Sequence, residues 1–244
     1  MTSTERLAPP TLGASVAGAS HERRGTPCQD AFALERPDGA LVIAVADGLG
    51  SAPRSELGAA AAVGAAVDAA IDHLDREPER AALEGLVAAR EALERVGRCG
   101  RIADVACTLM VVVASERVGI AHIGDGAVIG SRDGRFAVLS PPGVSEYVNE
   151  VDSLAADDWF DHVRCAVGLD GIDGVAAFTD GLHHATLRKD AGHLTAHDGF
   201  FGPLFSFLCD APDDAEEQLM RLLAGPKISE HSDDDKTLVL ALLP

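Results

Sequence analysis

The stretch that decides the fold is A-L-V-I-A-V-A-D-G-L-G at residues 40–50. Residues 40–46 are all apolar, and a short run rich in Val and Ile that is apolar on both faces predicts a strand inside a sheet. The run ends at Asp47-Gly48, where glycine permits backbone geometry that a side chain would forbid. We therefore expect an interior strand with a carboxylate at its carboxyl end.

Regular elements are expected on both sides of this strand. Pro37-Asp38-Gly39 predicts a hairpin that joins it to a preceding strand. Two long Ala-rich segments after it predict successive helices, with Pro78 near the start of the second. In chain order we expect strands at 12–20, 30–35 and 40–46, helices at 55–74 and 78–96, strands at 106–114, 118–123, 127–131, 136–139 and 175–178, helices at 200–209 and 211–223, and a last strand at 237–242.

This order of strands, a helix pair, more strands, helices and a final strand predicts an α+β fold rather than alternating β-α-β units. The length of 244 residues suits one domain over 1–244, with residues 1–11 disordered or loosely attached. Residues 141–161 contain two prolines and the only Trp and Tyr. We leave their structure unassigned and interpret them as a flap or a loop insertion.

Composition narrows the function. A formal net charge of −19 and the lack of long basic runs disfavour nucleic-acid binding. The longest apolar runs fall short of the roughly 20 residues that cross a bilayer, and the first residues lack the pattern of a secretory signal. The five cysteines are odd in number and form no C-x-x-C pair, so we expect reduced thiols and a cytoplasmic protein.

Three aspartates share one context. Asp47, Asp180 and Asp234 each lie beside an apolar strand that should be interior, where lone charges are expensive to bury. With only three lysines in the chain, metal cations are a natural counter-charge, and oxygen ligands favour Mg²⁺ or Mn²⁺ over zinc. A single Asp-Gly is more often a turn, so the evidence lies in the ordered set.

Six short blocks occur in a specific order between Gly13 and Leu242. Through them the chain resembles the PPM/PP2C-type metal-dependent protein phosphatases, particularly the compact bacterial branch. The family's D-G-x-G, G-T-T, G-D-S, S-D-G-L and D-N-x-T correspond to the last five of these blocks. The blocks are Q-D-A at 29–31, V-A-D-G-L-G at 45–50, A-C-T-L at 106–109, G-D-G at 124–126, F-T-D-G-L at 178–182 and D-D-K-T at 234–237.

The resemblance implies a four-layer α-β-β-α sandwich, with two antiparallel sheets flanked by helix pairs and two Mn²⁺ or Mg²⁺ ions bridged by a water. Carried over by residue, Asp47 would bridge both metals, and the carbonyl of Gly48 would bind one of them. Asp180 and Asp234 would bind the other, and Asp30 would hold metal-bound waters. Such enzymes hydrolyse phosphoserine and phosphothreonine in proteins, which implies phosphoprotein substrates and a Ser/Thr kinase counterpart.

The chain departs from the family pattern where an Arg usually grips the substrate phosphate, because that position is Gly25. A small loop shift would let Arg24 serve instead; the alternative is that Arg23 and Arg24 are simply an exposed pair. His21 lies in the same segment and could protonate the leaving alkoxide, or be an ordinary loop histidine.

Asp125 corresponds to a residue that helps to bind a third, weaker metal in many bacterial relatives. Its usual companion, an acid four residues after the Asp of the T-D-G block, is replaced by His184. Histidine is also a ligand for Mn²⁺, so a third site at Asp125 and His184 is an expectation.

Three other functions compete with a protein phosphatase. A pseudophosphatase would keep the fold as a binding module without turnover, and the missing Arg favours it. A hydrolase of small phosphate esters would use the same two metals. A purely structural acidic domain would not explain why the aspartates fall at the ends of buried strands.

Overall fold

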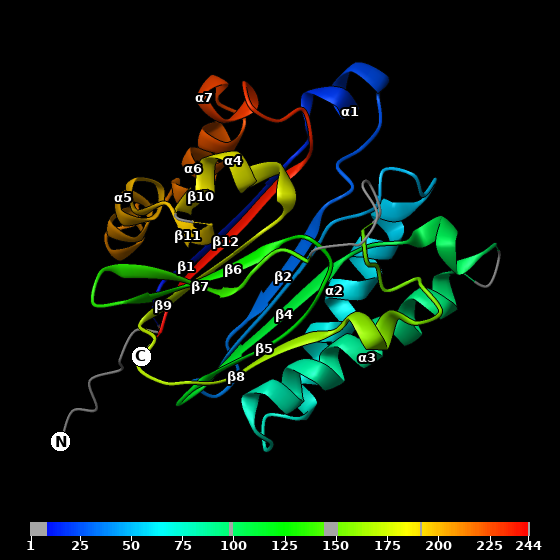
Figure 1. Ribbon diagram of the computed structural model, residues 1–244, viewed down its shortest axis with the longest axis horizontal. Helices are drawn as coiled ribbons and strands as arrows, with labels where there is room; N and C mark the ends of the chain where they lie inside the picture. Colours follow the sequence, from blue (N-terminus) through cyan, green and yellow to red (C-terminus); the bar gives the residue numbers. More distant parts are fainter. Residues whose placement is uncertain (1–8, 98–99, 144–150, 191, 244) are drawn as a thin grey trace.

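Two five-stranded antiparallel sheets lie at the centre of the computed structural model (Figure 1). It describes residues 9–97, 100–143, 151–190 and 192–243. The first sheet has the order β1 (Thr11–Val16), β12 (Lys236–Leu242), β9 (Gly174–Phe178), β6 (Ala127–Arg132) and β7 (Arg135–Ser140). The second has the order β2 (Ala31–Glu35), β3 (Leu41–Ala46), β4 (Leu109–Ala114), β5 (Val118–Ile123) and β8 (Arg164–Leu169).

Helices cover the outer faces of both sheets (Figure 1). The pair α2 (Ser55–Asp72) and α3 (Pro78–Gly97) packs on the second sheet, and α5 (Asp198–Cys209) and α6 (Ala215–Leu223) pack on the first. The predicted four-layer α-β-β-α sandwich is therefore confirmed. No helix among the described residues is long and apolar enough to cross a membrane. The shorter elements are α1 (Ala19–Arg24), α4 (His183–Thr186), α7 (Pro226–Ser229), the hairpin β10 (Leu187–Asp190) and β11 (His193–Ala196), and the 3-10 helices η1 (Ile102–Val105), η2 (Trp159–His162) and η3 (Asp180–Leu182).

Side-chain alternation along β3 shows why residues 41–46 carry no polar group. Leu41, Ile43 and Val45 pack between the two sheets, whereas Val42, Ala44 and Ala46 pack toward α2 and α3. Both faces are buried, so every position is apolar. The same alternation continued by one residue carries Asp47 to the intersheet side, at the end of the strand.

Several strands begin or end at the edge of the sandwich where Asp47 lies. Ala46 at the end of β3 pairs with Ala31 at the start of β2, and in the first sheet Phe178 at the end of β9 pairs with Leu238 near the start of β12. Antiparallel pairing thus brings segments far apart in the sequence to one edge. Residues 30, 47, 180 and 234 all lie in these connections.

The amino-terminal expectations need two corrections. The strand expected at 12–20 ends at Val16, and residues 19–24 form α1 instead. Glycines on both sides of α1 permit the change of direction: Gly18 has extended backbone, and Gly25 has a φ of 68° in the left-handed region. Residues 1–8 lie outside the described residues, while Thr11 pairs with Ala241 and so belongs to the sheet rather than to a loose segment.

The segment 141–161, interpreted as a flap or insertion, is described only in part, because residues 144–150 lie outside the described residues. Leu154 is fully buried in the core beneath α3, and its backbone N–H donates to Cys107. Arg90 on α3 donates to the carbonyl of Ala156 at 2.9 Å. This part is therefore fixed against the helix layer, and it leads into β8, a strand that the sequence pattern did not predict.

Candidate metal centre

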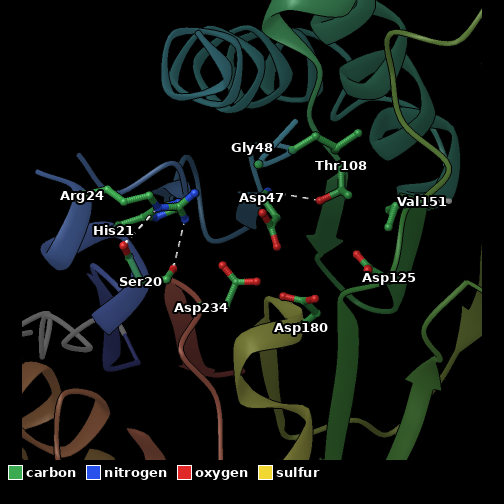
Figure 2. A pocket seen from close by; sticks show the side chains of 12 residues that line it. Ser20, His21, Arg24, Asp47, Gly48, Thr108, Asp125, Val151, Asp180 and Asp234 are labelled. Carbon is green, nitrogen blue, oxygen red and sulfur yellow. Dashed lines mark hydrogen bonds between the residues drawn. The ribbon is translucent and has the colours of Figure 1, made fainter. Parts of the chain in front are cut away.

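Carboxylates from separate connections converge in a pocket of about 260 Å³ at the shared end of the sheets (Figure 2). One ligand atom from each of Asp47, Asp125 and Asp180 lies within 4.8 Å of the others, so the three could hold a metal ion. Asp234 points into the same space. The pocket is lined by Ser20, His21, Arg24, Asp47, Gly48, Leu49, Gly50, Thr108, Asp125, Val151, Asp180 and Asp234.

Burial and neighbouring carboxylates raise the pKa values of these carboxyl groups. Burial raises the pKa of Asp47 well above its usual range, and the nearby charge of Asp30 raises it further. Burial and then Asp180 raise the pKa of Asp125 to about 6. The pKa of Asp180 is also raised, by burial and then by Asp234. Crowded carboxylates of this kind call for positive charge, which divalent cations would supply.

Asp30 lies beneath this cluster and links the two sheets. One of its carboxylate oxygens accepts hydrogen bonds from the hydroxyls of Thr179 and Thr237, both at 2.8 Å. Its other oxygen is buried without a hydrogen-bond partner, and burial raises the pKa of the group to about 8. The two threonines orient Asp30 and leave one oxygen unengaged.

The residue after Asp47 is a glycine because neighbouring segments leave no room for a side chain at position 48. Its N–H donates to the carbonyl of Gln29 at 3.1 Å, and a Cβ on Gly48 would lie 2.7 Å from that oxygen and 2.8 Å from the Cβ of Ser55. Any side chain would force these segments apart. Thr108 fixes the other side, since its hydroxyl accepts from the N–H of Asp47 at 3.1 Å.

The opposite side of the pocket is formed by α1 (Figure 2). His21 is 6% exposed, and its Nδ1 lies 2.7 Å from a carboxylate oxygen of Asp235. Arg24 lines the pocket and donates to the backbone and side-chain oxygens of Ser20 at 3.1 and 3.3 Å. Arg23 instead pairs with Asp233 at the exposed surface. The structure thus gives different surroundings to Arg24, the arginine expected to reach the phosphate, and to its neighbour Arg23.

The candidate residues are not all brought together. Asp30, Asp47, Gly48, Asp125, Asp180, Asp234, His21 and Arg24 lie in or directly beneath the pocket. His184 does not line it; it is exposed on α4 with its ring 6.3 Å from that of His231. The neighbouring His183 is the one that approaches Asp125, and its buried Nε2 has no hydrogen-bond partner. The expectation for His184 is thus not met, because the first turn of α4 points His183 inward.

Sequence reasoning missed several residues that shape the site. Thr108, Thr179 and Thr237 hold Asp47 and Asp30 by side-chain hydrogen bonds, and Asp235 holds α1. The alternation of side chains along β12 could have indicated two of these residues. Val239 and Ala241 face the space between the sheets. Thr237 and Asp235 precede them at the same spacing of two residues, so they are expected on the same side.

Comparisons with known proteins agree with this architecture. The protein phosphatase 2C family matches residues 17–224 of the chain. The chain is 30% identical to serine/threonine-protein phosphatase 3 of Escherichia coli (strain K12), over 94% of this chain and 96% of that protein.

Solved structures also share the fold. Serine/threonine phosphatase Stp1 from Staphylococcus aureus matches with a TM-score of 0.62 at 14% identity, over 98% of this chain and 96% of that one. The S. agalactiae serine/threonine phosphatase matches with a TM-score of 0.61, also at 14% identity, over 96% and 99%. Such identities describe the fold alone, whereas the family match extends over most of the sequence. The chain therefore belongs to the protein phosphatase 2C family.

Proposed function

We propose that this protein is a metal-dependent phosphatase that hydrolyses phosphoserine and phosphothreonine in proteins. The observation that carries the proposal is the convergence of Asp47, Asp125 and Asp180 within 4.8 Å, in a pocket that also contains Asp234. Membership of the protein phosphatase 2C family, and the name of the Escherichia coli relative, support the same activity.

The residues present fit divalent cations. Buried oxygens of Asp30 and Asp180 have no hydrogen-bond partner. Burial first, and then the charges of neighbouring carboxylates, raise the pKa values of Asp47 and Asp125. The donor set consists of carboxylates, which favours Mn²⁺ or Mg²⁺ over softer metals.

In this assignment Asp47 and the carbonyl of Gly48 would hold one cation, and Asp47 would also contact a second. Asp180 and Asp234 would hold the second cation, and Asp125 would contribute to a weaker third site. When bound, two such cations lower the pKa of a water and neutralise the phosphoryl oxygens, so that direct in-line attack needs no covalent enzyme intermediate. We do not extend the third site to His184, which lies outside the pocket.

Arg24 and Asp30 have separate roles. Arg24 lines the pocket and its hydrogen bonds are to Ser20, so its charge is available to the substrate phosphate. Asp30, held by Thr179 and Thr237, keeps one oxygen free of hydrogen bonds and would use it to orient a water bound at the cluster.

The proposal includes a Ser/Thr kinase counterpart and a cytoplasmic location. None of the four cysteines within the described residues forms a disulfide, which supports a reducing compartment. We also propose one catalytic domain over residues 1–244. The pairing of β1 with β12, from opposite ends of the chain, supports it.

The test is hydrolysis of a phosphothreonine peptide, of p-nitrophenyl phosphate and of small metabolite phosphates, with Mn²⁺, Mg²⁺ or EDTA. We expect metal-dependent turnover of the peptide that Asp47→Asn abolishes. Turnover of metabolite phosphates alone would favour the small-ester hydrolase. A folded, metal-binding protein that turns over none of these substrates would favour the pseudophosphatase.

A further inference from the structure

Asp235 makes an unusual set of contacts beside the pocket. It is 3% exposed, and its carboxylate accepts three hydrogen bonds from N–H groups. One oxygen accepts from the backbone N–H of Gly18 and from Nδ1 of His21, both at 2.7 Å. The other accepts from the backbone N–H of Gln29 at 2.6 Å. Asp235 therefore holds both ends of residues 18–29, the segment that carries His21 and Arg24.

These contacts fix the orientation of the His21 ring. Because an ionised carboxylate only accepts hydrogen bonds, Nδ1 carries a proton whenever it bonds to Asp235. Nε2 is then the nitrogen that gains and loses a proton, and within the described part of the chain it makes no hydrogen bond. His21 lines the same pocket as Asp47 and Asp234. A ring that is held by one nitrogen, whose other nitrogen is free of hydrogen bonds, and that belongs to a residue lining a polar pocket is arranged for proton transfer.

We infer that Asp235 is a positioning residue that holds His21 as the proton donor to the leaving oxygen of the phosphorylated serine or threonine. The inference rests on the proposed phosphatase function and adds the acid that the metal site does not provide. Among the described residues that line the pocket, His21 is the only imidazole. A guanidinium such as that of Arg24 is not a proton donor in acid catalysis, and the aspartates are assigned to cations.

The proposed step balances as follows. The bond between phosphorus and the serine oxygen breaks, and its electron pair goes to that oxygen. The proton on Nε2 of the His21 imidazolium transfers to the same oxygen and forms the alcohol. A water oxygen forms the new bond to phosphorus, and the proton that this water loses returns to Nε2 through solvent. The net reaction consumes one water and yields phosphate and the free hydroxyl.

The position of Asp235 is the second of the D-D-K-T block, where the family motif D-N-x-T has Asn. An Asn side chain has one accepting oxygen, so it would leave an amide group facing one of the three N–H donors. The carboxylate satisfies all three and places a negative charge beside the imidazolium. The His21–Asp235 pair is thus a feature of this chain's own residues.

The experiment compares two substrates that differ in their leaving group. A serine or threonine alkoxide is strongly basic and needs a proton as it leaves, whereas p-nitrophenolate is stable without one. Loss of an acid therefore lowers kcat for a phosphoserine peptide and largely spares kcat for p-nitrophenyl phosphate. A structural defect lowers both.

Four variants are measured with saturating Mn²⁺, alongside thermal melts. His21→Asn keeps an amide near Nδ1 for Asp235 but has no equivalent of Nε2. Asp235→Asn keeps shape and removes the charge, and the double variant combines the two. Asp233→Asn is the matched control, because Asp233 precedes the same strand but pairs with Arg23 at the surface.

We expect His21→Asn to lower kcat for the peptide by about 10²–10⁴-fold and kcat for p-nitrophenyl phosphate by less than about threefold. Asp235→Asn should lower peptide kcat by about tenfold with the same selectivity, and the double variant should be no slower than His21→Asn. Asp233→Asn should match the wild type.

Equal losses on both substrates would overturn the inference, as would multiplicative effects in the double variant. If Asp235→Asn does not fold, His21→Asn alone decides, since an unchanged ratio between the substrates rejects the acid. A wild type that hydrolyses neither substrate with metal present would instead refute the phosphatase function itself.

Discussion

Four carboxylates on one side of the pocket stand at the ends of buried strands, whereas His21 and Arg24 on the other side project from α1, a helix of six residues. Asp47, for example, continues directly from β3, in which all six residues are buried. The α1 side is held mainly by hydrogen bonds from Gly18, Ser20 and His21 to residues 233–235. The sheets therefore position the carboxylates proposed to bind metal, and hydrogen bonds to residues 233–235 position His21 and Arg24, the groups proposed to act on the leaving oxygen and the phosphate.

The largest expected effect is on the carboxylate side. Asp180→Asn should lower kcat by about 10³-fold or more and weaken Mn²⁺ binding, because it removes one charged ligand. The same change should stabilise the metal-free protein by about 1–2 kcal/mol, since it removes a crowded charge. Calorimetry in EDTA and Mn²⁺ titration test both effects.

Asp213→Asn, at an exposed position in the connection between α5 and α6, is the control and should change neither quantity. If the metal-free Asp180→Asn protein were clearly less stable than the wild type, the carboxylate cluster would be a structural network rather than a metal site.

The next effect separates the two neighbouring arginines of α1. Arg24→Ala should raise KM for a phosphopeptide by about 10–100-fold, because one charge-assisted contact to phosphate is lost. Arg23→Ala should leave KM within about twofold, since its partner is the exposed Asp233. Steady-state kinetics of both variants test this pair. Equal KM values for the two variants would remove Arg24 from the phosphate site.

The difference between the carboxylate side and the α1 side of the pocket also explains which features could be predicted from the sequence. Asp47 and Asp180 follow strands whose apolar runs are unmistakable, so the layered fold and the positions of these two carboxylates were predictable from the sequence pattern. His184 was expected at the site but lies outside the pocket, because neighbouring residues of a helix point in different directions and the sequence pattern did not decide which of residues 183 and 184 faces inward. Asp235 was missed because its partners Gly18 and His21 are more than 200 positions away. Local pattern carries no information about such pairs.

A third, smaller effect tests how closely α1 must approach the turn before β12. A Cβ on Gly18 would lie 2.3 Å from the carbonyl oxygen of Asp233, so Gly18→Ala must push the two segments apart. We expect a loss of about 1–3 kcal/mol in the free energy of unfolding and a fall in phosphopeptide turnover.

Gly64→Ala provides the matched control, because Gly64 is exposed on α2 with nothing within 4 Å of its added Cβ. It should stabilise the protein by about 0.4–1 kcal/mol and leave turnover unchanged. Urea unfolding of both variants measures the difference. If Gly18→Ala changed neither the stability nor the turnover, the contacts between α1 and residues 233–235 would tolerate displacement and would not set the position of His21.

The smallest effect concerns pH and acts on the carboxylate side alone. In metal-free protein, burial raises the pKa of Asp30 to about 8, whereas in the unfolded chain an Asp titrates near pH ~4. The folded state therefore keeps a proton that the unfolded state loses. Stability should be highest below about pH 4 as far as this group is concerned, and should fall as pH rises toward about 8.

Urea unfolding in EDTA should give a free energy of unfolding that is about 1–2 kcal/mol lower at pH 8 than at pH 5. The difference between the two pH values should be smaller for Asp30→Asn, because the variant lacks the titrating group. Saturating Mn²⁺ should reduce or reverse the slope, because cations favour the ionised carboxylates that bind them. If Mn²⁺ left the pH dependence of the free energy of unfolding unchanged, that dependence would not come from the carboxylate cluster. The hydrogen bonds of α1 would then be one alternative origin, because they do not involve the side chains proposed to bind metal.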